Sequence, residues 1–105
     1  YDHDMRVSLV RVALSRSGKA LKWYSERRVR MQGFQVEGVS AILPETIIPD
    51  GIFKSSKGER VAVEVEATIR KKSRFRFKVQ EYEALIGQPN PLIHRVLFVA
   101  CSDGE

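Results

Sequence analysis

Hydrophobic residues in the first third of the chain recur first at helical and then at strand-like spacing. Residues 3–16 have apolar positions at helical intervals and predict one amphipathic helix that ends at Ser17-Gly18. The positions expected to face the core are Met5, Leu9, Val12 and Ala13. Adjacent aromatic residues favour a strand around Leu21–Glu26, and the arginine-rich segment after it favours a short turn or helix to Met31.

Two further strands are expected in the middle of the chain. Ile47–Lys54 and Arg60–Thr68 predict an antiparallel pair, joined by a turn that contains Gly58. Because strand side chains alternate between the two faces, the second strand separates into two sets. One face has Val61, Val63 and Val65, and the other has Ala62, Glu64, Glu66 and Thr68. We expect the valine face to point into the core, so that both glutamates point the other way.

The C-terminal third predicts one helix and one strand. Ser73 is a suitable N-cap for a helix that runs to Ile86, and Gly87 and Pro89 follow it as terminators. The apolar positions of this helix, expected to cover the valine-bearing strand, are Phe75, Val79, Tyr82 and Ile86. The segment HRVLFVAC is short and rich in branched residues, which predicts a buried strand. The order α-β-β-β-α-β predicts an α/β fold with a mixed central sheet flanked by helices.

Composition restricts the function of this single expected domain, residues 1–105. Hydrophobic residues make up 43% of the chain and charged residues 30%, which is typical of a globular protein. The net charge of +5 and a pI near 9.7 suit a polyanionic partner such as nucleic acid or an acidic membrane surface. No apolar run could span a bilayer and no signal peptide is present, so no membrane contact is expected. The lone Cys101 indicates a reducing compartment, the cytoplasm, and the start at Tyr1 indicates a fragment of a longer protein.

Three acidic residues form a candidate metal site. Asp50 lies near the start of the first middle strand, and a hairpin that turns at Lys57-Gly58 brings it beside Glu64 and Glu66. Three carboxylates at one place repel each other unless a cation neutralises them, and Mg²⁺ or Mn²⁺ suits such oxygen ligands. The alternative is that valine and glutamate alternate because one face of the sheet is wet. The Pro-Asp-Gly sequence favours the site, because it leads into an apolar strand instead of ending one.

The same residues resemble a known superfamily. Asp50, a following strand and then Glu64-x-Glu66 are similar to the pattern of PD-(D/E)XK nucleases, and the predicted element order is similar to their restriction-endonuclease-like core. Glu66 stands where that superfamily has a lysine that positions and activates the attacking water. Some members relocate this lysine to the following helix, and the lysines available here are Lys71, Lys72 and Lys78. Lys78 is the best placed, because it lies four residues before Tyr82 on one helix face, similar to the Q-x-x-x-Y motif of some branches.

A second resemblance covers nearly the whole chain. The segments HDMRVSLVRVAL, WYSERRVR, IIPDGIF and VAVEVEATIRKKSRFRFKVQEYEAL, in this order, resemble the nuclease-like region of plasmid replication-relaxation proteins, which are associated with mobilisation and DNA relaxation. The resemblance implies a DNA-processing role and a winged-helix part that precedes this region. It makes DNA the expected partner and leaves other replication or mobilisation proteins as further candidates.

Two functions remain open at this stage. In the first, a Mg²⁺-dependent DNA endonuclease, Asp50 and Glu64 hold the metal, Glu66 joins them or orients water, and a helix lysine such as Lys78 stabilises the transition-state charge. In the second, the chain is a non-catalytic DNA-binding accessory module that kept the nuclease fold. Both functions use a basic segment, IRKKSRFRFK, beside the acids. Its cations, expected to contact DNA phosphates, are Arg70, Lys71, Lys72, Arg74, Arg76 and Lys78.

Other polar residues are weaker candidates. The alternative for the basic segment is a solvated helix face with its phenylalanines in the core, and a core position is expected for Phe75. Glu26 is either a fourth acid of the site or the partner of a neighbouring arginine, and Tyr82 is an auxiliary residue on the helix of Lys78. His3 and His94 are isolated in the sequence and are not expected to be ligands.

Overall fold

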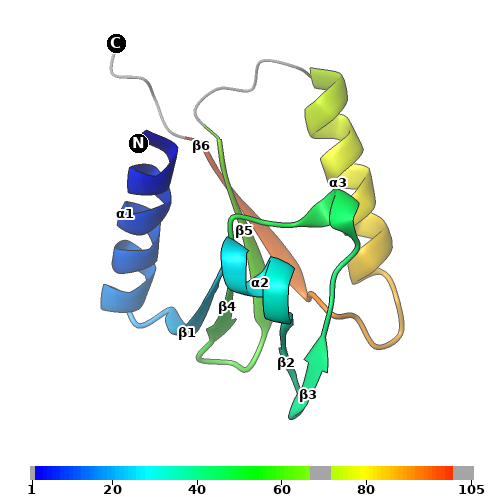
Figure 1. Ribbon diagram of the computed structural model, residues 1–105, viewed down its shortest axis with the longest axis horizontal. Coiled ribbons are helices and arrows are strands. Elements are labelled where there is room, and N and C mark those ends of the chain that lie inside the picture. The colour runs from blue at the N-terminus through cyan, green and yellow to red at the C-terminus, as the bar shows by residue number, and fades with distance from the viewer. Residues whose placement is uncertain (1, 67–71, 101–105) are drawn as a thin grey trace.

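A mixed four-stranded sheet forms the centre of the protein (Figure 1). The computed structural model describes residues 2–66 and 72–100. The strands of this sheet, in spatial order, are β1 (Ala20–Ser25), β4 (Gly51–Ser55), β5 (Arg60–Glu66) and β6 (Arg95–Ala100). The pairs β1–β4 and β4–β5 are antiparallel, whereas β5 and β6 are parallel. The predicted α/β architecture with a mixed sheet and flanking helices is therefore confirmed.

Helices cover both faces of this sheet. α1 (Asp2–Arg16) packs three apolar side chains against the valine face of β5, and these are Val7, Val10 and Leu14. α3 (Lys72–Ile86) lies on the opposite face, where Tyr82 is buried in the same core as Ala62 of β5. β5 is therefore a central strand that is covered on both faces, which gives a helix–sheet–helix arrangement of three layers.

α3 covers the central strand β5, as predicted, and it does so on the face opposite the three valines. Val61, Val63 and Val65 belong to the core under α1, whereas Glu64 lies on the side of α3. The four apolar positions expected on α3 are buried or half-buried, as predicted. Tyr82 and Ile86 belong to the core on the glutamate face, and Phe75 packs against Phe98 of β6. Alternation separated the two faces of β5 correctly, and it could not assign a helix to each because both faces of a central strand are covered.

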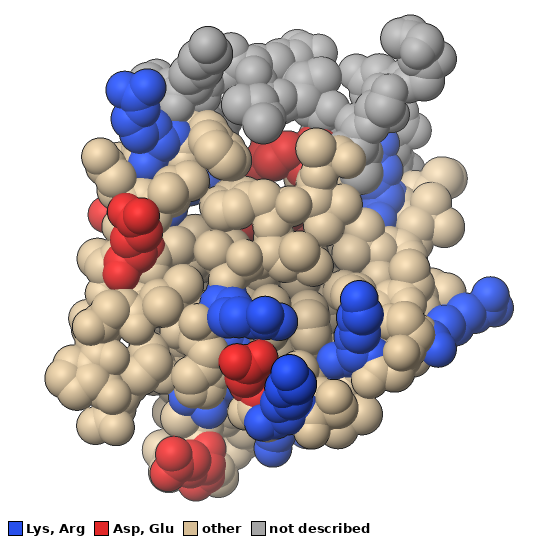
Figure 2. All heavy atoms as spheres, turned by 180° about the vertical axis from the view of Figure 1, so that it is seen from behind, with Lys and Arg blue, Asp and Glu red and all other residues tan. Residues whose placement is uncertain are grey.

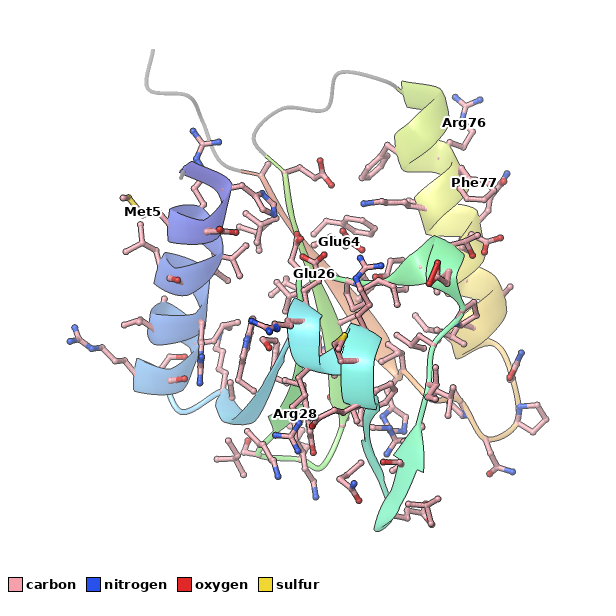
Figure 3. The ribbon with its side chains drawn as sticks, viewed as in Figure 1. Met5, Glu26, Arg28, Glu64, Arg76 and Phe77 are labelled. Carbon is pink, nitrogen blue, oxygen red and sulfur yellow. The ribbon has the colours of Figure 1, made fainter. Side chains whose placement is uncertain are left out.

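The predicted core face of α1 is wrong. Met5 is 60% exposed and Leu9 63%, and Figure 3 shows Met5 on the side of α1 that points away from the sheet. Val12 and Ala13 are exposed as well. Both sides of this helix are apolar, so helical periodicity alone could not decide which side packs on the sheet.

Several short elements lie between β1 and β4. α2 (Glu26–Gln32) corresponds to the short turn or helix expected there, and it begins where the Ser25 hydroxyl accepts a hydrogen bond from the Arg28 backbone N–H at 3.2 Å. A separate antiparallel hairpin, β2 (Phe34–Val36) and β3 (Val39–Ala41), was not predicted. Its two-residue turn has positive φ at both central positions, 49° at Glu37 and 84° at Gly38. A 3-10 helix, η1 (Glu45–Ile47), then leads back to the central sheet.

The C-terminal elements differ from prediction in detail. β6 is an edge strand and only partly buried, with Leu97 37% exposed, whereas a buried strand was expected. α3 is described from Lys72 onward, and the side chain of Ser73, the predicted N-cap, lies outside the described part of the chain. Cys101 is outside the described residues. Among the helices that the structure describes, none is long and apolar enough to cross a membrane.

Candidate functional site

Asp50 lies at the end of the sheet where β4 begins and β5 ends. Its backbone N–H donates to the Val63 carbonyl at 2.9 Å, which extends the β4–β5 ladder by one residue. Its carboxylate Oδ2 accepts a hydrogen bond from the Val65 backbone N–H at 2.7 Å. Val65 stands between Glu64 and Glu66, so this bond fixes Asp50 beside the two glutamates, as the hairpin predicted. The Asp50 side chain is 14% exposed.

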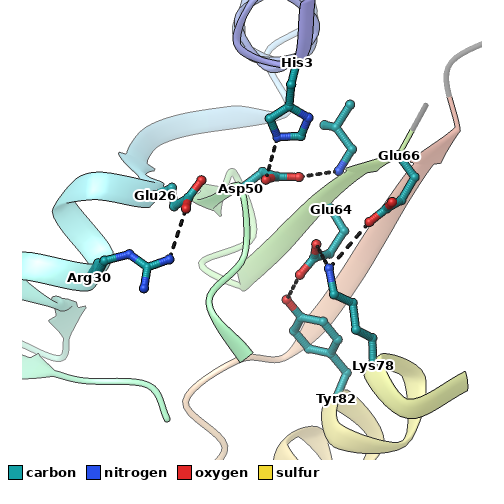
Figure 4. Close-up of polar contacts among 9 residues, drawn as sticks. His3, Glu26, Arg30, Asp50, Glu64, Glu66, Lys78 and Tyr82 are labelled. Carbon is teal, nitrogen blue, oxygen red and sulfur yellow. Dashed lines mark hydrogen bonds and ion pairs between the residues drawn. The ribbon is translucent and has the colours of Figure 1, made fainter. Parts of the chain in front are cut away.

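Glu64 is a buried acid with two side-chain donors from α3. Its residue exposure is only 2%, although it lies on the face that a wet sheet would expose. The Tyr82 hydroxyl donates to Oε2 at 2.6 Å, and the Lys78 Nζ donates to Oε1 at 3.0 Å (Figure 4). A charged group that loses its hydration needs other hydrogen-bond donors. The two donors from α3 replace the water molecules that would donate to an exposed glutamate.

Lys78 also reaches the second glutamate of β5. Its Nζ lies 3.5 Å from Oε2 of Glu66, whose side chain is 36% exposed. Lys78 and Tyr82 are one helical turn apart, and both point toward the β5 end from the same face of α3 (Figure 4). The candidate site is therefore a group of three acids, one lysine and one tyrosine at one end of the sheet, and we refer to it as the acidic site.

Burial controls the protonation of the acidic site. It raises the pKa of Glu64 above its ordinary value, although hydrogen bonds from Tyr82 and Lys78 act in the opposite direction. The charge of Asp50 adds a smaller upward effect on the pKa of Glu64. Burial alone would lower the pKa of Lys78, but the hydrogen bonds and charges of Glu64 and Glu66 outweigh it and raise that pKa. Lys78 is therefore a firmly protonated cation beside a carboxyl that accepts a proton more readily than an exposed glutamate does.

The donor atoms of the acidic site suit a divalent cation, but their arrangement suits it only in part. Asp50 and Glu64 offer the carboxylate oxygens that Mg²⁺ and Mn²⁺ prefer, and Asp50 is close enough for its charge to raise the pKa of Glu64. Within residues 2–66 and 72–100, no group of three or more His, Cys, Asp or Glu side chains is spaced to hold a metal ion. The Lys78 ammonium provides the positive charge between Glu64 and Glu66 instead. Asp50 and Glu64 are the two residues that could hold a cation.

His3 is part of this region although the sequence did not indicate it. Its Nε2 lies 3.0 Å from Oδ1 of Asp50, and its side chain is 41% exposed. The contact joins residues 47 apart in the chain, so no local pattern predicts it. Helical spacing is the one sequence feature that could have indicated this position. His3 lies four residues before Val7, and Val7 is on the face of α1 that packs on the sheet.

Glu26 is not in contact with the acidic site. Its Oε2 accepts from Arg30 at 3.1 Å, so the alternative interpretation, pairing with a neighbouring arginine, holds. Both side chains are about half exposed, at 47% and 48%. Glu26 and Asp50 nevertheless line the same cleft, of about 440 Å³, which opens between α1 and α2 beside the end of β1.

Two of the residues expected to contact DNA phosphates have side chains that the structure describes, and these two point in different directions. Lys78 points into the acidic site, whereas Arg76 is exposed on the outer side of α3 (Figure 3). Arg70 and Lys71, and the side chains of Lys72 and Arg74, are outside what the structure describes. On the described part of the rear face, lysine and arginine side chains stand apart from one another with acidic side chains between them (Figure 2).

The acidic site combines carboxylates with one protonated amine. Asp50 and Glu64 provide oxygen ligands, Lys78 provides a fixed positive charge, and Glu66 provides a carboxylate that is open to water. The groups come from two strands and one helix that meet at one end of the sheet (Figure 4). No family model matches this chain, and no curated protein or solved structure matches it either.

Proposed function

We propose that this chain is a DNA-processing domain with a restriction-endonuclease-like core, and that the acidic site cleaves phosphodiester bonds with the help of Mg²⁺ or Mn²⁺. The observation that carries the proposal is the position of Lys78, whose Nζ lies 3.0 Å from Glu64. The β5 strand has Glu66 where the nuclease pattern has lysine, and a lysine from α3 reaches the same place. This agrees with a relocated lysine, as in some members of the superfamily that the sequence resembles.

Each residue of the acidic site has a separate role in the proposed cleavage. A divalent cation on Asp50 and Glu64 would act as a Lewis acid on a phosphate oxygen. Lys78 stabilises the negative charge that develops on the phosphate in the transition state. Tyr82 holds the Glu64 carboxylate in place through its 2.6 Å hydrogen bond, and Glu66, which is partly exposed, can accept a hydrogen bond from the attacking water.

A non-catalytic DNA-binding module is the second candidate, because one specific observation favours it. Glu64 has a protein donor on each of its two oxygens, Lys78 on one and Tyr82 on the other. A carboxylate satisfied in this way is also what a structural ion pair needs. In this function Lys78 neutralises the acids permanently, and the domain binds DNA through its arginines and lysines.

Cleavage of a supercoiled plasmid separates the two candidates. We expect nicking in Mg²⁺ or Mn²⁺ that EDTA abolishes, and that Lys78→Met and Glu64→Gln each remove. Lys54→Met is the matched control, because Lys54 is exposed on β4 and is not part of the acidic site. Folding of each variant is checked by circular dichroism. Failure of the wild-type protein to nick at high concentration, or nicking that Lys78→Met leaves unchanged, contradicts the catalytic proposal.

A further inference from the structure

The cleft between α1 and α2 ends at the acidic site. It has a volume of about 440 Å³, and Asp50 is in its lining together with His3 of α1 and Glu26 of α2. Asp50 therefore faces the cleft through Oδ1, which contacts His3, while Oδ2 is bonded to β5. A group bound in this cleft lies against the residue that we propose as a metal ligand.

Three arginines line the cleft from opposite sides. Arg11 comes from α1, and Arg27 and Arg30 come from α2. Arg30 pairs with Glu26 at 3.1 Å, and the Arg11 guanidinium lies 6.0 Å from the centroid of the Trp23 ring. Arg27 is exposed, and it has no ion pair with any residue in the described part of the chain. Arg11 and Arg27 are therefore available to an anionic ligand.

An aromatic ring forms another part of the cleft wall. Trp23 is held between two residues of β4: its ring stacks on Phe53, with an interplanar angle of 6°, and it lies directly against Gly51. A Cβ atom at position 51 would be only 2.1 Å from Cζ2 of Trp23, so the indole occupies the place of a side chain there. Gly51 follows Asp50 in the chain, which places the indole next to the acidic site.

We propose that this cleft binds a single, unpaired nucleic-acid strand and leads its backbone to Asp50. The proposal rests on the proposed function and names the form of substrate that the acidic site receives. Arg11 and Arg27 contact phosphates, and a base packs beside the Trp23 indole, which lines the cleft with the Arg11 guanidinium over its ring. Stacking on an aromatic side chain beside arginines is how proteins bind single strands without reading their sequence.

The size and charge of the cleft favour a single strand over a duplex. A volume of about 440 Å³ is that of a small-ligand pocket, which can hold a nucleotide unit but cannot enclose a double helix. The cleft also contains acids, and two of them, Glu26 and Asp50, already have a basic partner. Asp4 is the third acid of the lining, so three carboxylates balance the three arginines. The cleft therefore offers a long duplex backbone no excess positive charge, and it offers a few phosphates the two separate cations Arg11 and Arg27.

The natural fluorescence of the protein gives a direct test. Trp23 is the one tryptophan in the sequence, so its emission reports on the cleft alone. The wild-type protein is titrated in EDTA with a fluorescein-labelled single-stranded oligonucleotide, and with the same oligonucleotide annealed to its complement. We expect the single strand to bind more tightly by anisotropy and to quench Trp23 emission over the same concentration range.

Paired arginine variants locate the binding surface. Arg11→Ala and Arg27→Ala remove cleft cations, and Arg16→Ala and Arg28→Ala remove cations from the same two helices outside the cleft. On single strands each lost phosphate contact reduces the magnitude of the log–log slope of affinity against salt by about 0.7. We therefore expect the slope of the double cleft variant to be about 1.4 smaller in magnitude than that of the wild type. The double control variant keeps the wild-type slope.

The outcomes separate this inference from the proposed function. Single-strand binding that quenches Trp23 and weakens only in the cleft variants supports the inference, whether or not the plasmid is nicked. Tighter binding to the duplex, binding without a change in Trp23 emission, equal losses in cleft and control variants, or no binding each overturns it. Nicking that depends on Lys78 would in those cases leave the proposed cleavage standing.

Discussion

Lys78 of α3 and Glu64 of β5 form an ion pair across the sheet face, with Nζ 3.0 Å from Oε1. The two side chains are unequally exposed, 25% for the lysine and 3% for the glutamate. Glu64 therefore depends on this pair more than Lys78 does, because only the lysine retains substantial contact with water. α3 therefore contributes to the contact with β5 both an apolar surface and the positive charge that Glu64 needs.

Removal of the lysine should destabilise the fold. Lys78→Met leaves the buried Oε1 of Glu64 without its donor, which costs about 1–3 kcal/mol for a buried polar group. Urea unfolding at neutral pH, read by circular dichroism, measures the loss. Lys54→Met, an exposed lysine on β4, should change stability by less than about 0.5 kcal/mol. Equal effects of the two variants would show that the ion pair does not stabilise the protein.

The pH dependence of stability should reveal the buried carboxyl. The pKa of Glu64 in the folded protein is raised above 4.5, so the stability that this group contributes is complete below pH 4.5 and is lost as the pH rises through the folded value. Glu64→Gln cannot ionise, so we expect its stability relative to the wild type to rise across that range. Urea unfolding of both proteins from pH 4 to 8 tests this, with Glu83→Gln on the exposed side of α3 as the control. Parallel curves for Glu64→Gln and the wild type would contradict it.

Tyr82 should matter through its hydroxyl as well as its ring. Tyr82→Phe keeps the edge contact with Phe98, whose centroid lies 6.0 Å from that of Tyr82, and removes the 2.6 Å hydrogen bond to Glu64. One buried carboxylate oxygen then lacks a donor, so we expect a loss of about 1–3 kcal/mol in urea unfolding. The loss should be smaller in the Glu64→Gln background, because an amide oxygen tolerates a missing donor better than a charged one. A full loss in that background would assign the effect to packing.

The acidic part of the site was largely predictable because its residues come from two strands that are adjacent in the sequence. Asp50 and Glu64 are brought together by one hairpin, and hairpin register follows from the turn at Gly58, whose φ is +81°. Lys78 could be expected on α3 because its spacing from Tyr82 fixes a helix face. The position of α3 over the glutamate face could not be predicted, since nothing local in the sequence states which side of β5 a distant helix covers.

The contribution of α1 was not predictable for a different reason. Its two sides are both apolar, and the exposed side, with Leu9 63% exposed, looked as suitable for the core as the buried side with Val10. The choice decides where His3 points, and therefore whether it reaches Asp50. An error in one helix face thus removed one residue from the predicted site.

Divalent cations should compete with Lys78 for the acids. A cation that binds only the folded protein raises the melting temperature by mass action. Because the Lys78 ammonium already lies on Glu64, we expect a modest rise with Mn²⁺ in the wild type and a larger rise in Lys78→Met, where that charge is gone. Asp50→Asn should abolish the rise in both backgrounds. Differential scanning fluorimetry over a Mn²⁺ series measures it, and a rise that survives Asp50→Asn would place the cation elsewhere.

Gly51 should be required for the position of the Trp23 indole. The indole fills the space that a side chain at position 51 would need, because a Cβ atom there would be 2.1 Å from Cζ2 and 2.7 Å from Cε2 of Trp23. Gly51→Ala must therefore displace the ring or the β4 backbone, and overpacking of this kind costs about 1–3 kcal/mol. Urea unfolding gives the loss, and a shift in the emission maximum of the single tryptophan reports whether the ring has moved.

A double variant separates this steric effect from a loss of backbone flexibility at Gly51. Trp23→Leu removes the ring atoms that an alanine Cβ would meet, so the two substitutions should be less than additive in Trp23→Leu/Gly51→Ala. Alanine at position 51 would then be tolerated, since it has space where the indole was. Strict additivity would mean that the ring and the glycine do not interact, and that the stack on Phe53 and the Arg11 guanidinium hold the indole in place without Gly51.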